Sequence, residues 1–304
     1  MFLLFLIASL TTEIWFPHQS LADTKSKILM QGTPFPNSVL YRPNDGNAHP
    51  GIVVLHGSEG GSLPYYNLEA QFLAAHGYSV LAFCWYNCNK DTIIGAFSPL
   101  ENVELRNTIK ALAWLKNSPA VGGKKVALVG FSRGAEQSVI LGSIADAVKL
   151  VDAVAVHTPA DVIVSGFNWG ATDRRCWICS TPDVACFKDT FDLEKWDWDN
   201  MRWNPACGSY PDFPEKMHAW LLDGVALPVN EPIKIENFKK PVFITVGDKD
   251  EEWDFNQSVR LADRLKKSGQ KVELHIFAGE HHTFSFENEN KRHDLLLKFL
   301  DKSL

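Results

Sequence analysis

Short apolar runs alternate with amphipathic segments along most of the 304-residue chain. Nearly every position in the runs is apolar, which is typical of strands buried on both faces. The runs occupy residues 51–56, 78–84, 125–130, 151–156, 241–246 and 272–277. Segments with apolar residues at helical spacing separate them, over residues 65–76, 100–117, 134–148, 255–268 and 288–302. This alternation predicts an α/β fold, with a mostly parallel sheet covered by helices on both faces.

The regular pattern breaks between the strands predicted at 151–156 and 241–246. Residues 160–235 are rich in Trp, Pro, Asp and Cys and contain six of the ten tryptophans. Because the flanking strands fit one sheet, we expect a single domain over residues 23–304, with a cap insertion at about 160–235. A structureless loop of this length is uncommon inside a compact domain, so short helices and disulfides are expected within the insertion.

The N-terminus has the layout of a secretory signal peptide. Residues 2–10 form an apolar run that is too short to span a bilayer. Ser20 and Ala22 place small residues on both sides of Leu21, which predicts a signal peptide over residues 1–22 that is cleaved after Ala22. The expected location is therefore periplasmic or secreted, and the alternative is a buried N-terminal strand or helix. No later segment approaches 18 consecutive apolar residues, so no integral membrane association is expected after cleavage.

Composition and charge narrow the class of protein. The 45% hydrophobic content is ordinary for a globular chain, which excludes disorder and a coiled coil. The chain has 30 Lys and Arg against 36 Asp and Glu, a formal net charge of −6. Nucleic-acid-binding domains are basic, so a nucleic-acid partner is not expected. The expected partner is a small molecule, and the oligomeric state stays open.

Six cysteines follow the predicted cleavage site, at Cys84, Cys88, Cys176, Cys179, Cys186 and Cys207. An exported chain meets oxidising conditions, so disulfides are expected. Six cysteines allow 15 pairings, between which the sequence does not choose, although a local Cys84–Cys88 pair is one option. The alternative is a zinc site formed by the last four cysteines. Cys176 and Cys179 are close-spaced, but the second close-spaced pair that is typical of such sites is missing. We predict disulfides and no metal or cofactor.

A nucleophile motif follows the strand predicted at 125–130. Gly130-Phe131-Ser132-Arg133-Gly134 is a G-x-S-x-G sequence that leads from this strand into a helix. In this context the motif forms a sharp turn that exposes the serine hydroxyl. The two glycines allow the tight turn, and the positive end of the helix dipole faces the position where negative charge develops. We predict Ser132 as the catalytic nucleophile.

A serine nucleophile needs a base and an orienting acid, and in this fold both come from later strand ends, the acid first. The strand at 241–246 is followed by Asp248 and Asp250, and the strand at 272–277 by His281 and His282. Asp250 is preferred as the acid, with Asp248 as the alternative. Either histidine fits the spacing of the base.

The oxyanion of an acyl-transfer intermediate needs two backbone N–H donors. One comes from the residue after the nucleophile, here Arg133, and the other from the loop after an early strand. That loop is His56-Gly57-Ser58-Glu59-Gly60-Gly61, in which Ser58 is our choice and Glu59 the alternative. For the side chain of Arg133 we expect a pair with Glu136, one helical turn further on.

These motifs together resemble one group of α/β-hydrolases. GFSRGAE at 130–136, the early glycine-rich loop, and Gly247-x-x-Asp250 followed by Trp253 are similar to the catalytic domain of acyl-CoA thioesterases and bile acid-CoA:amino acid N-acyltransferase. Dienelactone hydrolases are near relatives. The similarity covers about residues 50–160 and 238–302, and it implies Asp250 as the acid. It also implies His282 as the base, since His282 precedes Phe284 by one intervening residue.

The function expected from these observations is that of a serine hydrolase that cleaves a carboxylic ester or thioester through an acyl-enzyme. The acyltransferase of the resembled group uses cysteine, so the serine at 132 favours hydrolysis over transfer. One alternative is an acyl-CoA thioesterase, with the tryptophan-rich insertion forming the acyl pocket. An alternative of another class is a secreted, non-catalytic binding protein on a hydrolase scaffold.

Overall fold

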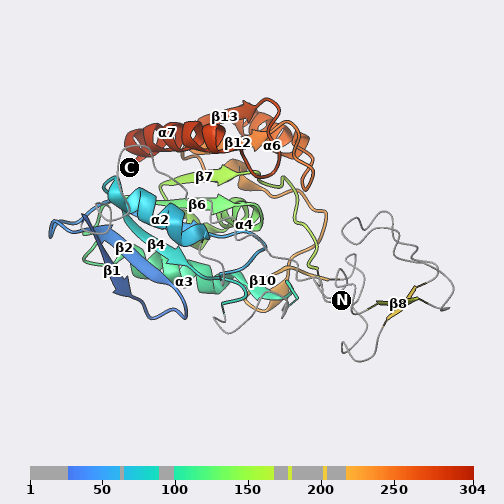
Figure 1. Ribbon diagram of the computed structural model, residues 1–304, viewed down its shortest axis with the longest axis horizontal. Helices are drawn as coiled ribbons and strands as arrows, with labels where there is room; N and C mark the ends of the chain where they lie inside the picture. Colours follow the sequence, from blue (N-terminus) through green and yellow to red (C-terminus); the bar gives the residue numbers. More distant parts are fainter. Residues whose placement is uncertain (1–26, 62–64, 89–98, 168–176, 180–200, 204–216) are drawn as a thin grey trace, which may run out of the picture.

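An eight-stranded sheet forms the centre of the molecule (Figure 1). The computed structural model describes residues 27–61, 65–88, 99–167, 177–179, 201–203 and 217–304. The sheet order is β1-β2-β4-β3-β6-β7-β12-β13. Its strands are β1 (Ile28–Gly32), β2 (Val39–Pro43), β3 (Gly51–Leu55), β4 (Ser79–Phe83), β6 (Val126–Phe131), β7 (Ala153–His157), β12 (Val242–Gly247) and β13 (Val272–Phe277). β2 pairs antiparallel with both β1 and β4, and all later pairings are parallel.

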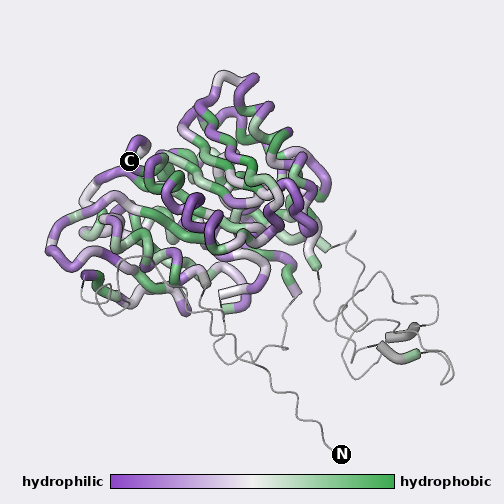
Figure 2. Tube along the Cα trace, turned by 45° about the horizontal axis from the view of Figure 1, so that its top comes forward, coloured by the Kyte–Doolittle hydropathy of each residue, from purple (hydrophilic) through white to green (hydrophobic). Residues whose placement is uncertain are grey.

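Helices cover both faces of this sheet. They are α2 (Tyr65–Ala75), α3 (Leu105–Lys116), α4 (Arg133–Leu141), α5 (Ala145–Val148), α6 (Asn256–Lys267) and α7 (Phe286–Ser303). In β3, Ile52 and Val54 pack into the core cluster that α2 and α7 close, whereas Val53 and Leu55 pack into the cluster that α3, α4 and α6 close. Figure 2 shows hydrophobic stretches in the interior of the fold and many hydrophilic residues along the chain around them. The predicted fold class is confirmed.

The six predicted strands and five predicted helical segments are present, with two differences in the helices. The helix expected from residue 100 begins at Leu105, because Val103 and Glu104 form the short strand β5 and the Glu104 side chain caps the helix by accepting the Arg106 N–H. The helix expected over 134–148 is divided into α4 and α5. The backbone leaves the helical conformation at Ile144, which is extended with a ψ of 119°.

Two strands, β1 and β2, were missing from the sequence prediction. In β1 only Ile28 is buried, and the other four positions are partly or fully exposed. The strand lies at the edge of the sheet, so it lacks the continuous apolar run by which the central strands were identified. Its place depends on pairing with β2, which the sequence pattern does not reveal.

The described parts of the segment between β7 and β12 form short strands. They are β8 (Trp177–Cys179) paired with β9 (Met201–Trp203), β10 (Trp220–Leu222) and β11 (Val225–Ala226), followed by the 3-10 helix η7 (Ile235–Asn237). β10 pairs with β5, and the fully buried Trp220 packs against Trp85 with ring centroids 5.1 Å apart. Before residue 235, the described residues of this segment thus contain strands where short helices were expected.

The described cysteines are oxidised. Cys84 and Cys88, which flank the turn after β4, form a disulfide, and Cys179 is also disulfide-bonded. A disulfide-bonded sulfur has no thiolate to offer a metal, so the alternative of a zinc site that includes Cys179 is excluded. The predicted signal peptide at 1–22 and the other three cysteines lie outside the described residues. No helix in the described part of the chain is long and apolar enough to cross a membrane.

Candidate active site

Ser132 lies at the sharp turn between β6 and α4, at the carboxyl end of the central strand. Its φ of 50° and ψ of −118° place a non-glycine residue in a strained backbone conformation. The backbone N–H donates to the His157 carbonyl at 3.0 Å, and the Ser132 carbonyl accepts the Glu136 N–H at 3.0 Å. These two bonds hold the turn between β7 and the first turn of α4. The geometry is that of a nucleophile elbow.

The two glycines of the elbow are required by close backbone approach. A Cβ at Gly130 would overlap the Gly134 carbonyl oxygen, and a Cβ at Gly134 would overlap the carbonyl oxygens of Leu55 and His56. Helix α4 therefore begins in direct contact with the end of β3. This contact brings the loop after β3 against the serine, since a Cβ at Gly57 would lie 3.2 Å from the Ser132 Cβ.

Asp250 and His282 meet across the loops after β12 and β13. The His282 Nδ1 lies 2.9 Å and 3.0 Å from the two carboxylate oxygens of Asp250, whose side chain is fully buried. The same carboxylate accepts the backbone N–H groups of Glu252 and Trp253, each at 3.0 Å. Because a carboxylate accepts, Nδ1 carries the proton and Nε2 is left as the basic nitrogen.

The two alternative residues have other partners. Asp248 accepts the Gly279 N–H at 2.6 Å and so holds the turn after β13. The His281 side chain is 64% exposed and contacts Glu251 at 3.1 Å, whereas the His282 side chain is 11% exposed. The structure thus brings together Asp250 and His282, and not Asp248 and His281.

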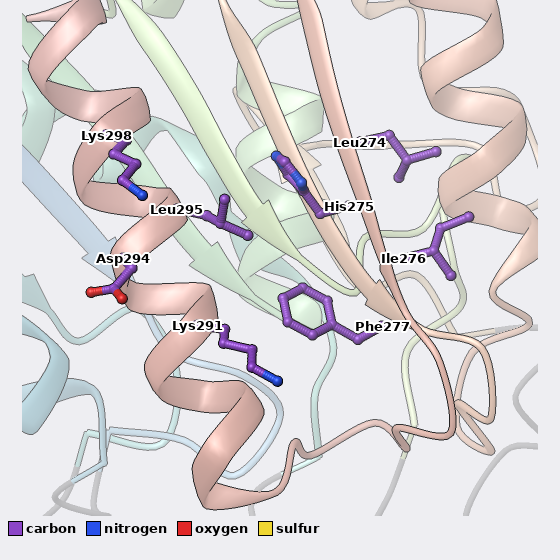
Figure 3. A pocket seen from close by; sticks show the side chains of 8 residues that line it. All are labelled: Leu274, His275, Ile276, Phe277, Lys291, Asp294, Leu295 and Lys298. Carbon is purple, nitrogen blue, oxygen red and sulfur yellow. The ribbon is translucent and has the colours of Figure 1, made fainter.

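One cavity of about 370 Å³ joins the predicted residues. Ser132, Ser58 and His282 line it, together with Gly57, Glu59, Phe131, His157, Thr158, Glu252, Thr283, Phe284 and Glu289. A larger hollow of about 620 Å³ lies between β13 and α7 (Figure 3), where Leu295 and Lys298 face the strand. Neither Ser132 nor His282 lines that second hollow, so the residues predicted to be catalytic face only the smaller cavity.

The loop after β3 is folded tightly against Ser132. The Glu59 carboxylate accepts the Gly57 N–H at 2.9 Å, and the buried ring of His56 stacks on Trp85 at 4.8 Å. Ser58, our choice for an oxyanion donor, lines the cavity beside Ser132. Arg133, the other choice, is the first residue of α4, and the first N–H groups of a helix have no acceptor within it. Both donor roles stay predictions.

The side chain of Arg133 pairs with Glu136, as expected from the sequence. Its Nη1 lies 2.7 Å from the Glu136 carboxylate, and both side chains are buried. Glu136 also accepts the Val164 N–H at 2.7 Å and the Trp220 indole N–H at 2.9 Å. The ion pair thus connects Val164 and Trp220 to the helix that follows Ser132.

His157 supports the site and was not singled out by the sequence. It ends β7, its Nδ1 lies 2.9 Å from the Thr245 hydroxyl, and its Nε2 lies 3.3 Å from the His282 carbonyl oxygen. Burial lowers the pKa of His157 to about 3, so the ring is neutral at pH 7. A neutral ring that donates from Nε2 to the carbonyl and accepts at Nδ1 fits both contacts. The sequence feature that could have indicated this role is the position of His157, a polar residue at the end of the apolar strand β7.

A buried ionic cluster lies behind the cavity. Arg292 contacts Glu69 at 3.0 Å and Glu289 at 2.5 Å, and His293 contacts Glu69 at 2.8 Å. Despite the opposing effect of burial, Arg292 and His293 hold the pKa of Glu69 down to about 2. Glu69, Glu289 and His293 have the spacing of metal ligands. The Arg292 guanidinium already pairs with both carboxylates, which makes the cluster an ion-pair network.

The acid limb of the dependence of kcat/KM on pH is expected to depend on Glu252. Burial opposes protonation of His282, but its hydrogen bond to Asp250 and the nearby carboxylates outweigh burial and raise the pKa of the ring. Glu252 is one of them, with its carboxylate 3.5 Å from Nε2. A base must be neutral, so a raised pKa moves the acid limb to higher pH. Glu252→Gln should move the acid limb of kcat/KM to lower pH.

The control for this shift is Glu287→Gln, which removes an 81% exposed carboxylate on α7 that does not line the cavity. Its pH profile should match that of the unchanged protein. An acid limb at the same pH in the Glu252 variant would show that this carboxylate does not act on the base.

The chain has the α/β-hydrolase fold, and comparisons with known proteins agree. Residues 37–170 match the dienelactone hydrolase family and residues 214–304 match the prolyl oligopeptidase family. A Pyrococcus furiosus esterase superposes with a TM-score of 0.57 at 15% identity, covering 94% of this chain and 96% of the esterase. A dienelactone hydrolase-like phosphotriesterase from metagenomic libraries gives a TM-score of 0.56 at 12% identity, covering 91% and 99%.

The sequence is similar to that of acyl-coenzyme A thioesterases. Acyl-coenzyme A thioesterase 1 of Rattus norvegicus is 28% identical over 159 residues, which are 52% of this chain and 34% of that protein. The mitochondrial acyl-coenzyme A thioesterase 2 of the same species is 23% identical over 236 residues, or 77% and 44%. The matched regions thus span less than half of each relative. The resemblance stated from the sequence is confirmed.

Proposed function

We propose that this protein is a serine hydrolase that cleaves a carboxylic ester or thioester through an acyl-enzyme intermediate. The observation that carries the proposal is the arrangement of Ser132, His282 and Asp250. The first two line one cavity, and the third holds the Nδ1 of the histidine at 2.9 Å. The serine elbow and the esterase and thioesterase relatives support it.

In this mechanism, His282 Nε2 takes the hydroxyl proton as the Ser132 Oγ attacks the acyl carbonyl carbon. The protonated imidazole, stabilised by Asp250, then gives that proton to the leaving alkoxide or thiolate as its bond to the acyl carbon breaks. Water, deprotonated by the same imidazole, attacks the acyl-enzyme, releases the acid and restores the serine hydroxyl. The backbone N–H groups of Ser58 and Arg133 would stabilise the oxyanion, and loss of one such donor typically costs about 2.7–4 kcal/mol of barrier height.

A fluorophosphonate probe tests the nucleophile without knowledge of the substrate. We expect the folded protein to be labelled once, with the adduct on Ser132 in a peptide map, because the base and oxyanion donors activate this hydroxyl. Heat-unfolded protein is the control and should not react. A folded protein that resists the probe would instead support a non-catalytic binding protein on this scaffold.

A second candidate is an acyl-CoA thioesterase, which the similarity to acyl-coenzyme A thioesterases favours. Both candidates use the same three residues, so they differ in the leaving group that the site accepts. Comparison of a simple ester with an acyl-CoA as substrates separates them.

A further inference from the structure

The cavity beside Ser132 is lined by acidic side chains. Glu59, Glu252 and Glu289 contribute carboxylates, and among the described lining residues there is no lysine or arginine. The loop over residues 248–254, which carries Asp250, contains five carboxylates and one lysine. Of these carboxylates, that of Glu252 lines the cavity.

The three carboxylates differ in how far other groups neutralise them. Glu289 is paired with the Arg292 guanidinium at 2.5 Å. Glu59 accepts the Gly57 N–H at 2.9 Å, and Glu252 has the ring of His282 as its partner at 3.5 Å. The contacts described for Glu59 and Glu252 thus include no permanent cation. Both side chains line the cavity beside Ser132 and His282; burial raises the pKa of Glu59, whereas the side chain of Glu252 is 58% exposed.

Two phenylalanines, Phe131 and Phe284, also line the cavity, together with Ser58, Thr158 and Thr283. Phe284 packs edge-on against the neutral His157 ring at 4.5 Å, and Phe131 lies 6.0 Å from the same ring with the Arg292 guanidinium 5.0 Å from its own ring centroid. Apolar walls exclude water and strengthen the field of nearby carboxylates, and aromatic faces attract cations. At about 370 Å³ the cavity matches a small ligand.

We propose that the site selects small esters whose leaving group carries a positive charge, such as an alkylammonium alcohol, and discriminates against anionic leaving groups. This inference rests on the proposed hydrolase function and specifies its substrate class. The cationic group would lie between the carboxylates of Glu59 and Glu252, with its alkyl groups against the aromatic wall. The phosphates of a coenzyme A thioester would meet the same carboxylates with like charge.

The test compares acetate esters that differ in charge. Acetylcholine and 3,3-dimethylbutyl acetate have the same shape and differ by one positive charge, 3-sulfopropyl acetate carries a negative charge, and acetyl-CoA is the polyanionic thioester. At low ionic strength, kcat/KM should be at least about tenfold higher for the cationic ester than for its neutral isostere, and lowest for the two anions. The preference for the cationic ester should decrease as salt is added, because salt screens the carboxylate of Glu252, whose side chain is 58% exposed.

Two variants test whether Glu59 and Glu252 cause the preference for the cationic ester. Glu59→Gln and Glu252→Gln should each bring the ratio of cationic to neutral ester closer to one, mainly by raising KM for the cation. Glu287→Gln, which removes a carboxylate away from the cavity, should leave the ratio unchanged. Equal turnover of the cationic and neutral esters, efficient turnover of acetyl-CoA, or a ratio that both variants leave unaltered would overturn the proposal.

The same measurements separate this inference from the proposed function. Hydrolysis of the neutral ester without a preference for the cationic ester would contradict the proposed charge selectivity but not the proposed serine hydrolase function. A protein that hydrolyses none of the four substrates and is not labelled by a fluorophosphonate would contradict both.

Discussion

Replacement of Ser132 by alanine should lower kcat by about 10⁵–10⁶. The loss is this large because the hydroxyl forms the acyl-enzyme, and without it the base and the oxyanion donors have no nucleophile to assist. Alanine keeps the Cβ, so the φ of 50° at this position stays as strained as before. The free energy of unfolding, measured by urea denaturation, should therefore change little.

Ser58→Ala is the matched control for this variant. It removes a hydroxyl from the same cavity but leaves the backbone N–H that is the proposed oxyanion donor. Steady-state kinetics with a neutral aryl ester should show most of the activity retained. Turnover near that of the unchanged protein in the Ser132 variant would end the serine hydrolase proposal.

Replacement of Asp250 by asparagine should lower kcat by about 10⁴, as in other serine triads. The asparagine amide can donate to Nδ1 of His282, which then keeps its proton on Nε2, the nitrogen that must accept one from Ser132. The shape of the side chain is preserved, and the carbonyl oxygen can still accept the N–H groups that now bind the carboxylate at 3.0 Å. The loss should therefore arise from the tautomer and the missing charge.

Asp248→Asn is the control, since it makes the same change of atoms two residues earlier. The amide oxygen can still accept the Gly279 N–H, so kcat should fall by less than about tenfold. A larger loss in the Asp248 variant than in the Asp250 variant would reverse the assignment of the acid. A normal pH profile in the Asp250 variant would likewise contradict its role beside His282.

Much of the fold could be predicted because its signals are local. The central strands are apolar at nearly every position, and the helices between them repeat apolar residues at helical spacing. Pairing at the edge leaves no such pattern, which is why β1 and β2 were missed: the outer strand buries only Ile28. The division of α4 from α5 arises from the extended backbone of Ile144, which the helical spacing of apolar residues over 134–148 does not show.

The candidate site could also be predicted in part from local sequence. The elbow at Ser132 is a local sequence with two glycines, and the order of strands places an acid and a histidine at the same sheet edge. His282 was preferred to His281 on the family resemblance, and sequence alone does not separate neighbours on a loop. The side-chain directions separate them: His281 contacts Glu251 in solvent, and His282 turns inward to Asp250.

The sequence by itself determined the α/β class, the strand ends that carry the chemistry and the position of the predicted nucleophile. Each of these depends on neighbouring residues, through hydrophobic periodicity, turn geometry and chain order. Only the tertiary structure decided which charges stand together. Glu59 and Glu252 line one cavity with His282 because two loops that lie far apart in the sequence converge beyond the carboxyl ends of parallel strands. Such convergence depends on long-range packing, which no local pattern of residues encodes.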